Sequence, residues 1–397
     1  MKFLIPLICS CAFALALPAD ALADSQPAPA ATVSPSPAPS PSPTATPKAF
    51  QVSGFGDVGV VSSSIAAPNG SITGRVFDNL DRRPQFHTLS LTAAYTGPVG
   101  GKLELNMGDD ADVIASYPKF GGVGTIDITQ AYASLTQGKF TLIGGKFETL
   151  AGAEVIESPS NVNFSRSILF GYAVPFTHTG ARLTYAASDK VSLIAGLNKG
   201  WDTTKTVTSN DNNRLTTELG LSLTPSAAFS FTAQAYTGIV EAFDPLANQR
   251  RSLIDLVGTY HFNDKLTGIV NYDSGRQTNS TLVDSFGVAQ PALGTATWTG
   301  LAGYISYALT PKVTGTLRGE YFNDANGSRT GLSQHWSEAT LTGAYALTPN
   351  VTFRLEGRKD HANSLYFATS EIDPKTGGYR TRSYLDTIGA EFLVKFP

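Results

Sequence analysis

The side chains that could do chemistry in this chain are few, and their spacing fits no catalytic or metal centre. Five histidines are scattered singly, without the paired ligand spacing of zinc sites: His87, His178, His261, His335 and His361. Asp109-Asp110-Ala111-Asp112 lacks the spacing and the distal glutamate of a calcium-binding hand, so we expect a solvated acidic loop. Asp360-His361 is the only adjacent acid–histidine pair, and such pairs arise often by chance. The sequence therefore predicts no enzyme activity, no metal site and no cofactor.

Most charged side chains instead fall on one face of short alternating segments. Val351, Phe353 and Leu355, for example, alternate with Arg354 and Glu356. A period of two is the pattern of a β-strand with one apolar and one polar face, and segments of about ten residues suit a tilted strand that crosses a bilayer. If the apolar face meets lipid, the polar face lines the interior, and the candidate interior residues are Lys102, Glu104, Arg182, Glu218, Asp255, Arg318, Glu320, Arg354, Glu356 and Arg358.

These interior charges have two interpretations. A barrel of about 16 strands leaves room for water, so charges of both signs on its inner wall are compatible with a hydrated pore. Alternatively, the charges pair across neighbouring strands and only brace the wall.

Short turns separate the alternating segments and predict the strand number. Seven of them have tight-turn chemistry, and longer polar stretches at 202–213, 274–294, 323–333 and 362–380 lie between them. The turns are 97–100, 137–138, 188–190, 224–226, 263–265, 310–312 and 348–350. Seven hairpins plus one strand at each end give an all-β transmembrane antiparallel barrel of about 16 strands, with 14 to 18 allowed, short periplasmic turns and long extracellular loops.

The end of the chain fits the closing strand of such a barrel. Ile388, Phe392 and Phe396 share an apolar face, opposite Glu391 and Lys395. The last strand of an outer-membrane barrel must pair with the first, so we expect Phe396 to be read by the barrel-assembly machinery. The net charge of -3 gives no reason to expect a nucleic-acid partner.

The start of the chain predicts export. Residues 1–23 have the basic residue, apolar stretch and small-residue cleavage site of a secretory signal peptide, and they contain both cysteines, Cys9 and Cys11. Residues 24–48 form a Pro/Ala/Ser-rich linker, which we expect to be a disordered tether. The barrel then occupies residues 49–397, and the outer membrane is the expected location.

Residues 148–177 do not have the pattern of a lipid-facing strand. They hold Glu148, Glu154 and Glu157 together with one arginine, Arg166. A long loop folded into the lumen would place these acids opposite basic wall residues and create a transverse field at a constriction. The alternative is an exposed surface loop.

Several short motifs resemble a known family. They are Arg75-Val76-Phe77-Asp78, Gly145-Lys146-Phe147, Gly152-Ala153-Glu154, Ser158-Pro159, Asn163-Phe164-Ser165-Arg166-Ser167, Pro175-Phe176-Thr177-His178-Thr179-Gly180 and Arg318-Gly319-Glu320-Tyr321-Phe322-Asn323-Asp324. Together they resemble the putative beta-barrel porin-2, or OmpL-like, outer-membrane family across residues 50–396. The resemblance implies an outer-membrane barrel treated as a porin, with no cofactor and no catalytic residues.

The expected function is passive diffusion of small hydrophilic solutes through an outer-membrane channel. The alternative is a non-conducting barrel whose extracellular loops bind a partner or substrate. Outer-membrane lipid and small solutes are the expected partners, and a homo-oligomer is compatible with the chain, because wide porins are often trimers.

Overall fold

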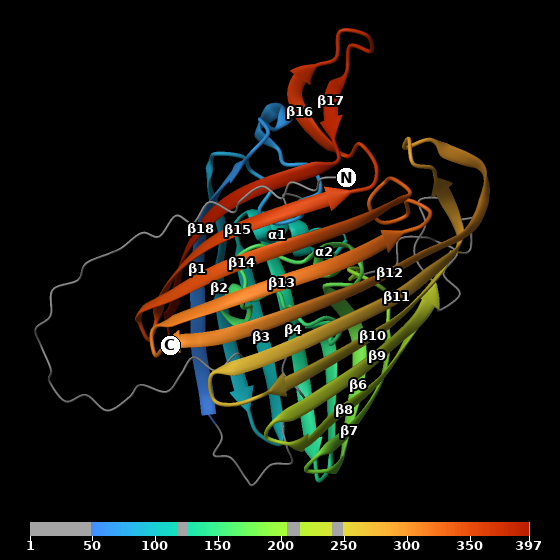
Figure 1. Cartoon of the computed structure of the whole chain (residues 1–397). Helices are drawn as coiled ribbons and strands as arrows, with labels where there is room; N and C mark the ends of the chain where they lie inside the picture. The colour runs from blue at the N-terminus through green and yellow to red at the C-terminus, as the bar shows by residue number, and fades with distance from the viewer. Residues whose placement is uncertain (1–48, 118, 120–124, 205–214, 240–248, 397) are drawn as a thin grey trace, which may run out of the picture.

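A closed antiparallel sheet forms the body of the protein, as the alternating segments predict. The computed structural model describes residues 49–117, 119, 125–204, 215–239 and 249–396. Within these residues sixteen strands close into one barrel (Figure 1). They are β1 (Ala49–Ser63), β2 (Pro84–Thr96), β3 (Val99–Met107), β4 (Ile126–Gln137), β5 (Phe140–Glu148), β6 (Thr177–Ser188), β7 (Val191–Asn198), β8 (Thr216–Ser226), β9 (Phe229–Ile239), β10 (Arg250–His261), β11 (Leu266–Val283), β12 (Ala289–Thr310), β13 (Val313–Asp324), β14 (Gln334–Thr348), β15 (Val351–Ala362) and β18 (Tyr384–Phe396).

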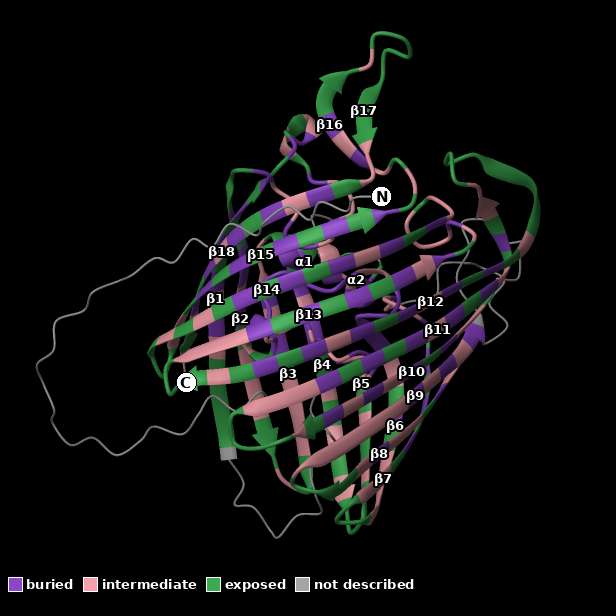
Figure 2. Cartoon of the chain, in the orientation of Figure 1, coloured by how far each residue is buried: buried purple, intermediate pink, exposed green. Residues whose placement is uncertain are grey.

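Burial alternates along the strands with the predicted period. In β15, Phe353 and Leu355 are exposed, whereas Arg354 and Glu356 between them are buried. Figure 2 shows the same alternation as bands of exposed and buried residues along β12 to β15. The exposed apolar residues encircle the outside of the barrel, where they form the surface that a bilayer covers. The polar faces point inward, as expected.

The seven predicted turns each join two neighbouring strands and lie at one end of the barrel, which we call the short-turn end. The longer connections lie at the opposite, long-loop end. One prediction there was wrong, because residues 274–294 are mostly strand: β11 continues to Val283 and β12 begins at Ala289. The pairing of these strands continues past the barrel wall, with Thr281 opposite Leu293, because it is made by backbone N–H and C=O groups whatever the side chains.

The terminal strand closes the barrel as predicted. β18 pairs with β1 on one side and β15 on the other, and Phe396 lies opposite Gly54. A Cβ atom on Gly54 would lie 2.5 Å from Cε2 of Phe396, so only glycine leaves room for the terminal aromatic ring.

Among the described residues, four short helical segments and one small sheet are not part of the barrel wall. They are η1 (Pro68–Gly70), α1 (Asp109–Ile114), η3 (Ser158–Ser160), α2 (Ile168–Tyr172) and the hairpin of β16 (Phe367–Ile372) and β17 (Tyr379–Arg382), which projects from the long-loop end (Figure 1). In the part of the chain that the structure describes, no helix is long and apolar enough to cross a membrane.

The predicted solvated loop at Asp109 to Asp112 is instead the helix α1. Asp110 is buried there, and its carboxylate lies 3.0 Å from Nδ1 of His87 on β2. This ion pair holds α1 against the inner wall. The run of aspartates by itself does not predict such a contact.

Residues 149–176, between β5 and β6, fold into the barrel, and we call this segment the lumen loop. It contains η3 and α2, which Figure 1 shows inside the ring of strands. Phe164, Leu169 and Phe170 of the loop are buried in one hydrophobic cluster with Trp298 and Trp336 of the wall. The hydrophobic core of the protein therefore lies inside the barrel.

Candidate functional site

The lumen loop is held by a wall glutamate that binds the first turn of α2. Backbone N–H groups at a helix start have no partner within the helix. Glu320 on β13 accepts two of them, from Ile168 at 2.6 Å and from Leu169 at 3.1 Å. Ser167 caps the same turn by accepting a hydrogen bond from Phe170 N. The carboxylate of Glu320 therefore serves as a support for the loop.

A second wall glutamate binds the lumen loop in the same way, at residues that precede α2. Glu356 on β15 accepts hydrogen bonds from the backbone N–H groups of Phe164, at 2.8 Å, and Ser165, at 3.1 Å. Thr342 on β14 donates to the same carboxylate at 2.7 Å. Both glutamates lie on the inward face that the strand period predicts, but their partners are backbone atoms of the loop.

Arg318 connects the loop to the wall through five donors. Its side chain is fully buried and forms ion pairs with Glu338 on β14, at 2.7 Å, and with Glu154 of the loop, at 2.8 Å. The same guanidinium donates to the backbone oxygen and the hydroxyl of Ser165 and to Thr340. A buried arginine with every donor occupied is a strong geometric restraint.

Two further wall arginines bind carbonyl oxygens of the loop. Arg354 pairs with Glu391 on β18 and donates to the carbonyl oxygen of Asn161 at 2.7 Å. Arg358 pairs with Asp360 and donates to the carbonyl oxygen of Arg166 at 2.7 Å. The side chain of Arg166 itself donates back into the loop. The walls from β13 to β18 are therefore covered by the lumen loop.

The inward charges elsewhere on the wall are either paired or bonded to neutral side chains. Arg182 on β6 forms an ion pair with Glu218 on β8 at 2.9 Å. Asp255 on β10 is fully buried and accepts a hydrogen bond from Asn271, whose own oxygen accepts from the backbone N–H of Ala153 in the loop.

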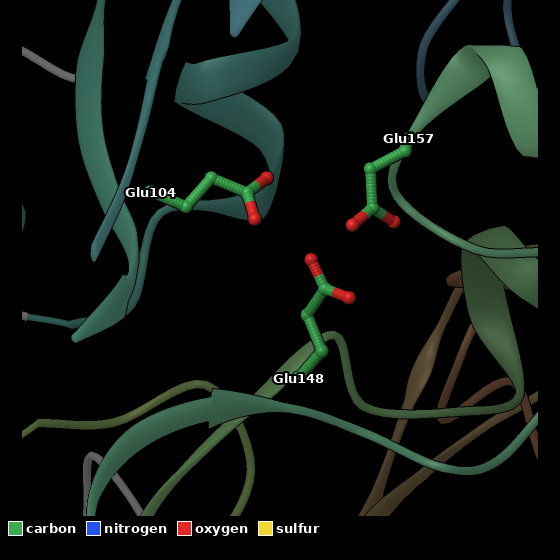
Figure 3. A group of neighbouring side chains, drawn as sticks. All are labelled: Glu104, Glu148 and Glu157. Atoms are coloured by element: carbon green, nitrogen blue, oxygen red, sulfur yellow. The ribbon is translucent and has the colours of Figure 1, made fainter. Parts of the chain in front are cut away.

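Three acidic side chains gather on the opposite side of the lumen, and Figure 3 shows their carboxylates pointing toward one another. They are Glu104 on β3, Glu148 at the end of β5 and Glu157 in the loop, with ligand oxygens all within 4.8 Å of one another. Nζ of Lys102 lies 2.7 Å from Glu104 and 3.7 Å from Glu157. We call the three glutamates the acidic group, and Lys102 supplies a positive charge beside them.

Lys102, the partner of the acidic group, borders free space. A cavity of about 600 Å³ at the short-turn end is lined by Lys102 and by Tyr132, which lies opposite Lys102 across the β3–β4 pair. Burial raises the pKa of the Glu157 carboxyl, and the negative charge of Glu104 raises it further, with Lys102 acting in the opposite direction. Carboxylates that repel one another are sensitive to the ions that approach them.

The fourteen candidate interior residues thus divide into two groups. Lys102, Glu148 and Glu157 are half-buried, and of these Lys102 lines the cavity. The other eleven are buried in the wall or under the loop, namely Glu104, Glu154, Arg166, Arg182, Glu218, Asp255, Arg318, Glu320, Arg354, Glu356 and Arg358. Glu154 faces a basic wall residue, Arg318, as expected for an acid of this loop, and it lies apart from the acidic group.

Sequence reasoning missed three partners of this network. Glu338 lies on the inward face of β14, and Asp360 shares the inward face of β15 with Arg358, so the strand period alone could have found both. Arg75 lies before the second strand and forms ion pairs with Asp78 and Asp360, and only its place in the Arg75-Val76-Phe77-Asp78 motif marked it.

Comparison with known proteins agrees with this geometry. The family model described as "Putative beta-barrel porin-2, OmpL-like" matches residues 49–396. No curated protein matches the chain. Among solved structures, OmpT of Vibrio cholerae has a TM-score of 0.59 at 11% identity, covering 88% of this chain and 99% of that one. The outer membrane channel DcaP of Acinetobacter baumannii has a TM-score of 0.59 at 13% identity, covering 88% of this chain and 97% of that one. An anion-selective porin from Comamonas acidovorans has a TM-score of 0.58 at 10% identity, covering 88% of this chain and 100% of that one.

The closed barrel with an inward-folded loop defines a porin-like outer-membrane channel rather than an enzyme. The chain belongs to the beta-barrel porin-2, OmpL-like family. The solved structures share its fold at low identity, so they describe the architecture of the barrel and leave its solute to the residues of this chain.

Proposed function

We propose that the barrel passes small hydrophilic solutes by passive diffusion along the side of the lumen that the loop leaves open. The observation that carries this proposal is the contrast between the two sides. Wall charges from β13 to β18 are buried under the loop, whereas Lys102, Glu148 and Glu157 are half-buried, and Lys102 also lines a cavity of about 600 Å³. The acidic group then forms the narrow part of the passage, with the lumen loop as the constriction.

Insertion of the purified protein into planar bilayers tests this proposal. We expect discrete single-channel steps that are small for a barrel of this strand number, because the loop fills much of the lumen. A barrel that inserts and never conducts would rule the proposal out.

Neutralising the acidic group should change ion selectivity. In Glu148→Gln/Glu157→Gln, Lys102 loses nearby negative charges, so we expect the permeability ratio of K⁺ to Cl⁻ to fall by about threefold or more. The reversal potential in a salt gradient measures this ratio. Glu371→Gln is the matched control, because Glu371 is exposed on β16 and pairs only with Arg380 at 3.5 Å among the described residues. An equal shift in the control would remove the acidic group from the passage.

The same ratio should depend on pH. An acid whose pKa is raised is charged above that pKa and loses its charge earlier as the pH falls. Because burial raises the pKa of Glu157, we expect K⁺ preference to decline on acidification with a midpoint above about 4.3, the value of an unperturbed glutamate. Glu157→Gln should remove this part of the profile, and an unchanged profile in that variant would contradict the assignment.

The alternative is a plugged barrel whose long loops bind a partner. The burial of eleven interior charges favours it, since a sealed lumen requires such pairing. Silent wild-type barrels that conduct once the loop is removed would establish this alternative.

The proposal also includes export and assembly. We infer that residues 1–23 are cleaved as a signal peptide, that residues 24–48 act as a linker, and that Phe396 directs the barrel to the assembly machinery. Both terminal segments 1–23 and 24–48 lie outside the described residues. Phe396 at the β1–β18 seam supports the third inference. A homo-oligomer is proposed from the porin fold alone, and cross-linking in membranes would reveal it.

A further inference from the structure

Two arginines and a tryptophan meet at the long-loop end of the barrel, in an arrangement that the passage beside the acidic group does not use. Trp201 follows β7, Arg251 is the second residue of β10, and Arg329 lies between β13 and β14. The guanidinium carbon of Arg251 lies 4.6 Å from the Trp201 ring centroid, and that of Arg329 lies 5.5 Å from it. All three side chains are half-buried, so they are packed in place and still reach solvent.

The surrounding structure fixes these side chains. Arg251 donates from Nε to Gln277, its neighbour on β11, at 2.7 Å. Arg329 donates from Nε to the backbone oxygen of Tyr172, at the end of α2. Trp298 stands edge-on to Trp201, with centroids 6.2 Å apart, and Arg329 lies 5.2 Å from its ring as well. In both arginines the bond is made by Nε, which leaves the terminal nitrogens of the guanidinium fork directed elsewhere.

The two positive charges have no direct ion-pair partner among the described residues. No described carboxylate lies within 4.0 Å of either guanidinium, whereas Arg318, Arg354 and Arg358 in the wall each have one. The charges of Asp202 and Asp324 act on the two arginines from farther away, because both carboxylates bond to backbone N–H groups instead. Asp202 accepts the backbone N–H groups of Phe176 and Thr177, both at 2.8 Å.

Asp324 is occupied in the same way. It accepts three backbone N–H groups, from Ser328, Arg329 and Thr330, as well as the hydroxyl of Thr330. Two cations held against one indole repel each other, and cation–π contact offsets only part of that cost. An anion between the two forks would relieve the repulsion and complete their hydrogen bonds.

We propose that Trp201, Arg251 and Arg329 form a binding site for the carboxylate or phosphate group of a small solute at the long-loop mouth. The planar forks of arginine match both groups, and the indole provides an apolar surface beside them. The site lies at the opposite end of the barrel from the short-turn cavity, so it captures a solute before the acidic group is reached.

Equilibrium binding to the full-length protein in detergent tests the site without requiring conduction, so failure here and failure of the channel proposal are distinguishable. Succinate and inorganic phosphate are the two probes, titrated by calorimetry. Tryptophan emission is a second readout, because two of the chain's three tryptophans lie at the site. We expect saturable binding of at least one probe, and the one that binds identifies the preferred group.

Arg251→Gln and Arg329→Gln should each raise Kd by about tenfold or more, the loss expected for a charge-assisted hydrogen bond. Arg251→Lys keeps the charge and loses the planar fork, so it should also weaken binding. The matched control is Arg250→Gln, which removes the same charge from the adjacent residue, whose exposed side chain donates to Thr237. Retained heat-modifiable migration in gels shows that each variant is folded. The proposal is overturned if neither probe binds saturably, or if Arg250→Gln raises Kd as much as the substitutions at Arg251 and Arg329 do.

Discussion

Replacing residues 153–173 with a short Gly-Ser linker should raise single-channel conductance by about threefold or more, because a barrel of sixteen strands has an interior wide enough for water once its contents are removed. The replaced segment contains η3 and α2 and makes the contacts to Glu320 and Glu356. Conductance in planar bilayers measures the change. Ion selectivity should also weaken, since Glu157 leaves with the segment.

The control for this deletion shortens a different long connection. Removing the tip between Ile372 and Tyr379, in the β16–β17 hairpin, leaves the lumen loop unchanged. Its conductance should equal that of the wild type. Replacing residues 153–173 leaves charges of the wall without partners. The variant with the shortened lumen loop therefore also carries Glu320→Gln and Glu356→Gln, which remove two of these charges. A folded barrel whose conductance stays at the wild-type value would show that the loop does not limit the passage.

Arg318→Met should release the lumen loop at a cost of about 3–5 kcal/mol, the range found when one partner of a buried ion pair is removed. The substitution leaves the buried carboxylates of Glu154 and Glu338 without their cation and removes the bonds to Ser165. We expect the loop to become sensitive to protease in the folded barrel, and channel recordings to become noisier as the loop moves.

Two comparisons make this result specific. Lys359→Met removes an ion pair with Asp386 whose side chains are 67% and 46% exposed, so it should cost at most about 1 kcal/mol. Adding Glu154→Gln and Glu338→Gln to Arg318→Met removes the unpaired charges and should restore part of the protease resistance. Equal loss in Lys359→Met, or no restoration in the triple variant, would mean that Arg318 does not hold the loop through its ion pairs.

The motifs that resemble the family explain why the loop is held so firmly. Arg75 of the first motif pairs with Asp360, and Glu154 of a central motif pairs with Arg318 of the last one. Segments separated by 150 or more residues therefore meet at one plug inside the barrel. In this chain the family pattern marks the contacts between the loop and the wall.

The strand number, the direction of each side chain and the closing role of β18 could be predicted from the sequence, because they depend on a period of two and on local turn chemistry. The same reasoning failed where the local pattern is ambiguous. Asp109 to Asp112 resembled a solvated loop until His87 supplied a buried partner for Asp110. Residues 274–294 resembled a loop because both faces of the extended strands are polar.

The amino-acid sequence by itself determined that Arg318, Glu320, Arg354 and Glu356 point into the barrel, since alternation assigns each residue to one of two faces. Only the tertiary structure decided what they meet there. Their partners are the backbone and side chains of a loop about 150 to 190 residues earlier in the chain, and no local period connects positions so far apart. Charge alone does not distinguish a residue that faces water from one that binds a helix end, because both need an inward carboxylate or guanidinium.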